Sequence, residues 1–341
     1  MKYSIPYFPG LVKFWESRPE LADVVEEIYF DLGQAAFSSE FIKIEDKIWS
    51  ELIKMKQDNG IQLHQVHSRS VQHARNLLPN SIQAIVNRLN EASKRGVDRV
   101  TLGNPLLLNH MPVRRALAGV KLSTGLLDEI RTLSQVQSWV ERFDVDVLLV
   151  HPDSNRNGSE LIKIKKFASS HGVQVCLLVN EGCLPRCPFR KQEYDMLETL
   201  GKLPDKLRGQ VFQTFFANTC GVIYRKRPES LLQSPFILPA AFDSLTDKAD
   251  LLRISGLDSP PNVLEKLLTS LLDGTTDGLL LYGEYLSRLS PLQGADILLS
   301  DFFGSDYLSK LEDCKSHCAD CDVCGDRFKA IIHKHRLVMN K

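Results

Sequence analysis

The chain has 341 residues, of which 43% are hydrophobic and 25% are charged, and its 42 basic and 42 acidic side chains give a formal net charge of zero. This length is sufficient for one large α/β domain with an extension or for two ordinary domains, and the apolar fraction is sufficient for a sizeable core. The balanced charge gives no sign of nucleic acid or an anionic membrane as the main partner, so an RNA substrate is not favoured.

Eight short apolar runs, each of strand length, alternate with helix-length segments along the first 256 residues. The predicted strands cover residues 3–8, 24–30, 61–67, 99–103, 120–124, 145–151, 173–180 and 249–256. Between them, residues 81–95, 134–143 and 159–170 place apolar side chains at the three-and-four spacing of one helix face. Strands that alternate with helices are typical of parallel sheets joined by helical crossovers.

We therefore predict a closed (β/α)8 barrel of the TIM type over residues 1–274, followed by a cysteine-rich helical extension over residues 275–341. The runs DVLLV and VCLLV are almost entirely apolar, as expected for strands buried on both faces. An open, doubly wound sheet is the alternative. It has less support because the chain has neither the glycine fingerprint of dinucleotide-binding folds nor a Walker loop.

No apolar run approaches the roughly 18 residues of a membrane span, and the first residues lack the pattern of a secretory signal. We therefore expect a cytoplasmic protein without a membrane span. Thiols stay reduced in the cytoplasm, so clustered cysteines there are metal ligands or catalysts rather than disulfides.

Polar side chains follow several predicted strands at their carboxyl ends, where the functional residues of a barrel lie. The candidates for a substrate pocket on these loops are Asn104, His151, Asp153, Asn155, Arg156, Asn180 and Glu181. For each of them the alternative is a structural role, such as a helix cap. Glu181 is a candidate acid or base because it lies beside a cysteine loop, and capping or a salt bridge is its alternative role.

The first cysteine group consists of Cys183 and Cys187 on one loop and Cys220 further along the chain. Thiolates favour zinc or iron–sulfur clusters over hard cations, so this group is a candidate metal or cluster site. Free cysteines are often core residues, but these two follow a strand end beside glycine and proline, where packing is a weak explanation. Cys176 lies inside an apolar strand, and we expect it to be a packing residue.

The second cysteine group consists of four residues within an eleven-residue stretch near the C-terminus: Cys314, Cys318, Cys321 and Cys324. Zinc and a four-iron cluster both accept four thiolates, and this pattern leaves the choice open. His317 is a fifth candidate ligand, although we expect it to face solvent. The first three cysteines also have the spacing of radical S-adenosylmethionine enzymes. That interpretation is disfavoured by their position near the C-terminus and by the fourth cysteine.

Four phrases of the chain, VTLGNPLLL, VKLSTGL, VDVLLVHPDSNRN and CLLVNEGCLPRCPFR, follow one another in this order. Together they resemble the collagenase-like proteins of peptidase family U32. The resemblance extends over residues 1–260, and its matching positions are Asn104, Pro105, Asp153, Asn155, Arg156, Asn180, Cys183, Leu184, Cys187, Pro188 and Arg190. Glu193 stands where the related motif often has histidine, and the second cysteine group is additional.

The resemblance implies a barrel with a four-iron four-sulfur cluster, and it adds Arg190 to the candidate site residues. Several members of this family are oxygen-independent hydroxylases. They include the paired proteins of anaerobic ubiquinone synthesis and enzymes that hydroxylate RNA, with prephenate implicated as the oxygen source.

A ligand count bears on the number of metal sites. Cys183, Cys187 and Cys220 supply three thiolates, whereas a four-iron cluster usually takes four. Either one cysteine of the second group completes the cluster, or the second group holds its own metal, which is a second cluster or zinc. We hypothesise two sites.

Three functions are compatible with these patterns. The favoured one is an iron–sulfur enzyme that performs oxygen-independent redox or hydroxylation chemistry on a small metabolite or cofactor precursor, with a protein partner or electron donor. The second is a non-catalytic iron–sulfur subunit of a hydroxylase complex. The third is a peptidase, against which stands the absence of the sequence motifs H-E-x-x-H and G-x-S-x-G.

Overall fold

A computed structural model describes residues 1–31, 41–67, 78–193, 196, 205–256, 260–275, 305–311, 314 and 318–334 of the chain. The chain divides into two compact units. Unit 1 comprises residues 1–151, 162–178 and 246–261, and unit 2 comprises residues 152–161, 179–245 and 262–341. The predicted division at residue 274 stays a prediction, because residues 276–304 lie outside the described part.

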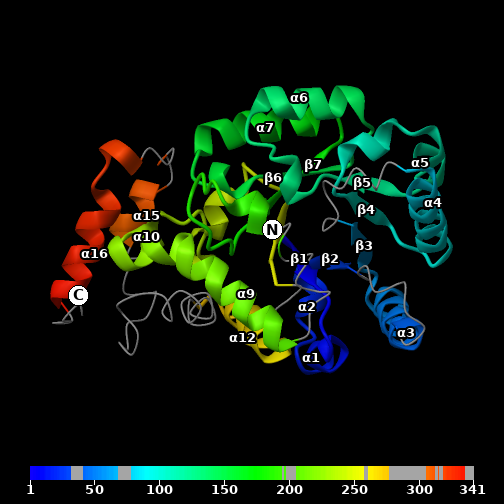
Figure 1. Cartoon of the computed structure of the whole chain (residues 1–341), viewed down its shortest axis with the longest axis horizontal. Helices are drawn as coiled ribbons and strands as arrows, with labels where there is room; N and C mark the ends of the chain where they lie inside the picture. The colour runs from blue at the N-terminus through cyan, green and yellow to red at the C-terminus, as the bar shows by residue number, and fades with distance from the viewer. Residues whose placement is uncertain are drawn as a thin grey trace. The chain divides into compact units, whose positions relative to one another are not determined.

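Unit 1 contains a closed barrel of eight parallel strands in which each strand pairs with its neighbours in chain order and the last pairs with the first (Figure 1). The strands are β1 (Lys2–Pro6), β2 (Val25–Phe30), β3 (Gln62–His67), β4 (Arg99–Leu102), β5 (Lys121–Ser123), β6 (Val147–Val150), β7 (Gln174–Leu178) and β8 (Leu251–Arg253). Each falls within a predicted strand or within one residue of it. The prediction of a (β/α)8 barrel is confirmed, and the open sheet is ruled out.

Helices follow the strands of unit 1 and cover the barrel from outside. They are α1 (Leu11–Ser17), α2 (Leu21–Val24), α3 (Phe41–Asn59), α4 (Pro79–Lys94), α5 (Met111–Ala116), α6 (Leu133–Arg142) and α7 (Gly158–Ser170), with 3-10 turns η3 (Pro105–Asn109) and η4 (Leu126–Asp128). The helices α4 and α5 pack against each other (Figure 1). The three helices expected from periodicity are thus confirmed as α4, α6 and α7.

Unit 2 is built from the segments that follow β6, β7 and β8 in the chain. Its elements are η5 (Pro152–Ser154), α9 (Asp205–Asn218), α10 (Cys220–Lys226), α11 (Ser230–Gln233), η6 (Pro239–Leu245), α12 (Pro261–Leu272), α15 (Ser305–Leu311), η8 (Cys318–Asp320) and α16 (Val323–Lys334). Helix α10 packs against α9 and α11, and α11 packs against α16. No helix among the described residues is long and apolar enough to cross a membrane.

Three of the strands are each directly preceded by an aspartate, and this aspartate joins its strand to the preceding strand at the amino end of the barrel. The carboxylates of Asp98, Asp146 and Asp250 each accept a hydrogen bond of 2.8 Å, from the backbone N–H of Leu63, Leu122 and Val175, respectively. The backbone N–H of each aspartate also donates to the carbonyl of the same partner residue. This repeated pair of bonds fixes β3 to β4, β5 to β6 and β7 to β8.

One side of the barrel interior is apolar. Val147 and Leu149 from β6, Cys176 and Leu178 from β7, and Leu251 from β8 form a buried cluster. Cys176 is fully buried within it, which confirms its expected packing role.

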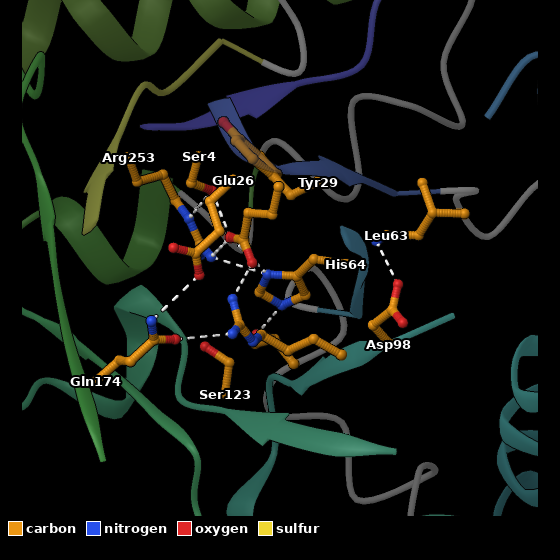
Figure 2. A network of polar contacts seen from close by, with 12 residues as sticks. Ser4, Glu26, Tyr29, Leu63, His64, Asp98, Ser123, Gln174 and Arg253 are labelled. Atoms are coloured by element: carbon orange, nitrogen blue, oxygen red, sulfur yellow. Dashed lines mark hydrogen bonds and ion pairs between the residues drawn. The ribbon is translucent and has the colours of Figure 1, made fainter. Parts of the chain in front are cut away.

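The other side of the interior contains a buried polar network around the Glu27 carboxylate on β2. Figure 2 shows Ser4, His64 and Arg253 converging from three strands. Glu27 accepts a hydrogen bond of 2.5 Å from the Ser4 hydroxyl and one of 2.9 Å from the Arg253 guanidinium. It also contacts His64 at 3.1 Å and pairs with Arg99. The network therefore links five strands, β1, β2, β3, β4 and β8.

Electrostatics keep Glu27 charged although it is fully buried. Burial by itself raises the pKa of the Glu27 carboxyl, but the contact with His64 and the charges of Arg99 and Arg253 outweigh it and hold the pKa well below its usual value. Burial lowers the pKa of His64 to about 4, so its imidazole is neutral at neutral pH. Two guanidinium groups thus surround one carboxylate inside the barrel.

Candidate functional site

Two of the predicted pocket residues, Asn104 and His151, lie in unit 1. The Asn104 side chain accepts a hydrogen bond of 3.0 Å from the N–H of Leu106 and caps η3, the structural role that was the alternative for this residue. The buried His151 lies directly after β6, and its Nε2 is 3.3 Å from Nη2 of Arg131.

The loop after β6 belongs to unit 2, and its polar side chains are bound to the backbone of residues 232–235. Asn155 donates from Nδ2 to the Pro235 carbonyl at 2.9 Å. Arg156 donates from Nη1 to the Leu232 carbonyl at 2.9 Å and from Nη2 to the Ser234 carbonyl. Both side chains are buried, so these contacts anchor the loop firmly within unit 2.

Asp153 and Arg190 form a buried ion pair with an N–O distance of 3.2 Å. Arg190 also donates from Nη2 to the Leu184 carbonyl at 3.1 Å, and its guanidinium reaches the Cys183 thiol. Although burial opposes it, the interactions of Arg190 with Cys183, Glu181 and Asp153 raise the pKa of its guanidinium. Arg190 is therefore a permanent positive charge beside Cys183.

The first cysteine loop folds back on itself after β7. The Glu181 carboxylate accepts a hydrogen bond of 3.2 Å from the N–H of Cys183, and Asn180 beside it is buried. The backbone N–H of Cys187 donates to the Leu184 carbonyl at 3.2 Å, which closes a turn between the two cysteines. Within this turn Arg186 adopts a left-handed backbone conformation with φ of 53°. The turn places Cys187 back towards the residue that follows Cys183.

Cys220 is brought to this loop by α10, of which it is the first residue. One turn later in the same helix, the Tyr224 hydroxyl donates to the Gly182 carbonyl at 3.0 Å, directly before Cys183. Tyr224 interacts electrostatically with the thiols of Cys183, Cys220 and Cys187. The hydrogen bond of Tyr224 thus joins α10, which begins with Cys220, to the loop that carries Cys183.

The thiols of the first group are in an environment that opposes ionisation. Burial raises the pKa of Cys183 well above its ordinary value, and the charges of Glu181 and Glu193 raise it further. Burial likewise raises the pKa of Cys187, and it raises that of Cys220 to about 11. A metal or cluster would supply the positive charge that turns these thiols into thiolates, so the donor set fits a soft metal.

Glu193 is a site residue that the sequence argument did not include among its candidates. Its carboxylate interacts electrostatically with all three thiols of the first group. Burial and the charge of Glu181 raise the pKa of Glu193 to about 7. The signal available in the sequence was its position three residues after Arg190, where related motifs often have histidine.

The second cysteine group also comes together in unit 2. Cys314 follows α15, Cys318 begins η8, Cys321 follows that turn, and Cys324 lies in the first turn of α16. The Cys318 thiol interacts electrostatically with the other three cysteines of the group. The Cys324 thiol interacts in the same way with Cys314 and Cys321. His317 lies outside the described residues.

Among the described residues, no group of three or more histidine, cysteine, aspartate or glutamate side chains is arranged to hold one metal ion. That arrangement requires all donors to reach a single atom. The cysteines of an iron–sulfur cluster bind different iron atoms, so their sulfur atoms are spread more widely.

Comparison with known proteins gives one related sequence and several similar folds. No family model matches the chain. Over 284 residues it is 24% identical to an uncharacterized protease of Methanocaldococcus jannaschii, an alignment that covers 80% of this chain and 79% of the relative. Among solved structures, the U32 peptidase Mk0906 has a TM-score of 0.49 and 16% identity, over 76% of this chain and 95% of that one. The YdjI aldolase of Escherichia coli K12 has a TM-score of 0.39 and 11% identity, over 86% and 92%.

Proposed function

The chain is related to the U32 peptidases, as its motifs predicted, and from this premise we propose that it is an iron–sulfur enzyme. Its cluster is bound by Cys183, Cys187 and Cys220. The reaction is an oxygen-independent redox or hydroxylation step on a small metabolite or cofactor precursor.

The observation that supports this proposal is the convergence of the three cysteines. Two come from the loop after β7 and one comes from the start of α10, and Tyr224 contacts all three electrostatically. A purely structural role gives no reason to place three thiols together next to a permanent cation, Arg190. A positive charge in this position offsets the negative charge of cluster-bound thiolates and helps to orient them.

The cluster would supply electron transfer, and the surrounding side chains have separate roles. Arg190 offsets the negative charge of the Cys183 thiolate and is itself held in place by Asp153 and the Leu184 carbonyl. Glu181 fixes the cysteine loop through the N–H of Cys183. Glu193 interacts electrostatically with all three thiols and adds a carboxyl group to this site.

The other predicted catalytic residues, Asn104, His151, Asn155, Arg156 and Asn180, stay predictions. In the structure, Asn155 and Arg156 use their side chains to bind backbone carbonyls, and Asn104 caps a turn. Such contacts are typical of residues that shape a loop rather than of residues that touch a substrate.

A peptidase is the second candidate, because the related sequence is named a protease. The two functions differ in their need for iron. A peptidase would cleave denatured collagen or another protein substrate as the iron-free chain, whereas the proposed enzyme would be inactive in that form. A non-catalytic partner subunit would bind iron but would show turnover only in a complex.

The test of the proposal is the iron and acid-labile sulfide content of the full chain purified without oxygen. We expect iron and sulfide in equal amounts, together with the broad visible absorption of an iron–sulfur chromophore. The double variant Cys183→Ser, Cys187→Ser should lose one cluster's worth of both elements.

Cys176→Ala is the matched control, because it removes a buried thiol from a packing position of β7. It should keep the wild-type iron content. The proposal is wrong if the double variant and Cys176→Ala contain as much iron as the wild-type chain.

A further inference from the structure

A buried cation lies beside Cys324 of the second cysteine group, and the described part of the chain shows no ion pair between this cation and a carboxylate. This cation is Arg156, whose side chain is only 4% exposed. Its two terminal nitrogens bind the carbonyls of Leu232 and Ser234, and its Nε is buried without a hydrogen-bond partner. A buried guanidinium that faces only neutral carbonyls is costly, because burial of a charge without a counter-charge is unfavourable.

The groups nearest to this guanidinium include cysteines and a tyrosine. The Leu232 carbonyl that binds Arg156 at 2.9 Å is also 3.6 Å from the Cys324 sulfur and 3.3 Å from the Tyr307 hydroxyl. The Tyr307 hydroxyl is in turn 3.0 Å from the Cys324 sulfur. Arg156 and Cys324 therefore meet at one backbone carbonyl, although they are far apart in the sequence.

The remaining cysteines of the group lie in the same environment. Cys318 interacts electrostatically with Arg156 and with Cys314, Cys321 and Cys324. All four cysteines belong to the short connection from the end of α15 to the first turn of α16. The ion pair between Arg327 and Asp306, 3.5 Å long, ties these two helices together. All four cysteines therefore lie within eleven residues between two helices that an ion pair joins.

We propose that Cys314, Cys318, Cys321 and Cys324 bind a metal centre of their own, separate from the first group, and that Arg156 is the positioning residue whose charge offsets its thiolates. The centre has four thiolate ligands and is an iron–sulfur cluster, because no group of described side chains is arranged around a single metal ion, whereas the ligands of a cluster bind different iron atoms. Four thiolates exceed the positive charge of the cluster core. The buried guanidinium thereby gains the counter-charge that the described protein groups do not provide.

This inference is independent of the proposed enzyme function, because it concerns different ligands. It assigns Arg156 a role in building the second centre, in place of the role in a substrate pocket that its position after β6 suggested. It also explains why Asn155 and Arg156 bind to the backbone of residues 232–235, which lies against α16 through α11.

The first experiment compares the metal content of three full-length chains purified without oxygen: wild type, Cys318→Ser with Cys321→Ser, and Cys183→Ser with Cys187→Ser. Iron, zinc and sulfide are measured in each. The variant of the second group should lose one centre and keep the metal of the first group. Loss of iron with sulfide is the result expected for a cluster, whereas loss of zinc alone contradicts it. An unchanged content of all three elements in this variant overturns the proposal.

The second experiment tests Arg156 itself. Arg156→Gln removes the positive charge. Arg156→Lys retains the positive charge but replaces the planar N–H donors of the guanidinium with a single ammonium group. We expect metal of the second centre to pass to a chelator roughly tenfold faster in Arg156→Gln than in wild type, a typical effect of removing a partner of a metal ligand. The rate of metal transfer from Arg156→Lys should lie between the rates from wild type and from Arg156→Gln. Equal rates in wild type and both variants, or equal losses in the two variants, overturn the role of the charge.

Discussion

At the scale of single residues, a carboxyl group in unit 1 has an altered acidity that does not depend on a metal. Asp128, at the end of η4, accepts a hydrogen bond of 2.7 Å from the N–H of Gly125, while its Oδ1 is buried without a partner. Burial raises the pKa of Asp128 to about 7, and the hydrogen bond from Gly125 offsets part of this effect. The folded chain therefore binds a proton that the unfolded chain releases at lower pH.

This shift predicts a specific pH dependence of stability. The stabilisation due to protonated Asp128 is fully present below the unfolded pKa of about 4, and it is lost as the pH rises through about 7. Between these values, wild-type chain should lose up to about 1.4 kcal/mol of unfolding free energy per pH unit relative to Asp128→Asn. Urea unfolding of both chains from pH 4 to pH 8 measures the difference. A difference that does not change with pH contradicts the assignment.

At the scale of elements, the repeated aspartate contact explains how neighbouring strands keep their register at the amino end of the barrel. Asp250 illustrates it, since its carboxylate accepts from the N–H of Val175 at 2.8 Å and pairs with Lys165 at 2.5 Å. The phrases VDRV, VDVL and ADLL contain these aspartates just before the strands. Their shared position was visible in the sequence, but their bonding partners lie on the preceding strand and were not.

Replacement of one such aspartate should destabilise unit 1. Asp250→Ala leaves the N–H of Val175 without its carboxylate acceptor, and loss of one partner of a buried hydrogen bond costs about 1–3 kcal/mol. Denaturant unfolding measures this cost, and hydrogen exchange of the Val175 amide should become faster. Asp247→Ala is the control, because the Asp247 side chain is 62% exposed and its pair with Lys248 should be worth under about 1 kcal/mol. Equal stability of the two variants would contradict the role of the contact.

At the scale of the whole molecule, the barrel and the two cysteine groups belong to different units of the chain. All seven cysteines of the two groups belong to unit 2, whereas Cys176 belongs to the barrel. The barrel interior instead contains the Glu27 network, which links strands β1 to β4 with β8. Barrel closure and metal binding therefore depend on different residues.

The Glu27 network should be essential for the stability of the barrel. Glu27→Gln leaves Arg99 and Arg253 buried without their shared carboxylate, and removal of one member of a buried ion pair costs about 3–5 kcal/mol. We expect a large fall in the unfolding free energy and in the yield of folded chain. Glu26→Gln, which alters a neighbouring carboxylate that accepts from Gln174 at 3.2 Å, is the matched control. A Glu27→Gln chain as stable as Glu26→Gln would show that the network is dispensable.

The eight strands and three of the helices followed from the sequence alone, because apolar strand runs and helical periodicity are local properties of the chain. The two cysteine groups are likewise visible in the spacing of the sequence, and their role as metal ligands stays a prediction. The partners of these residues did not follow from the sequence. Cys220 meets the first cysteine loop through α10, Arg156 meets Cys324 at the Leu232 carbonyl, and Glu27 meets Arg253 across the closure of the barrel. These contacts join residues that are far apart in the chain, so only the tertiary structure decides which charges and thiols come together.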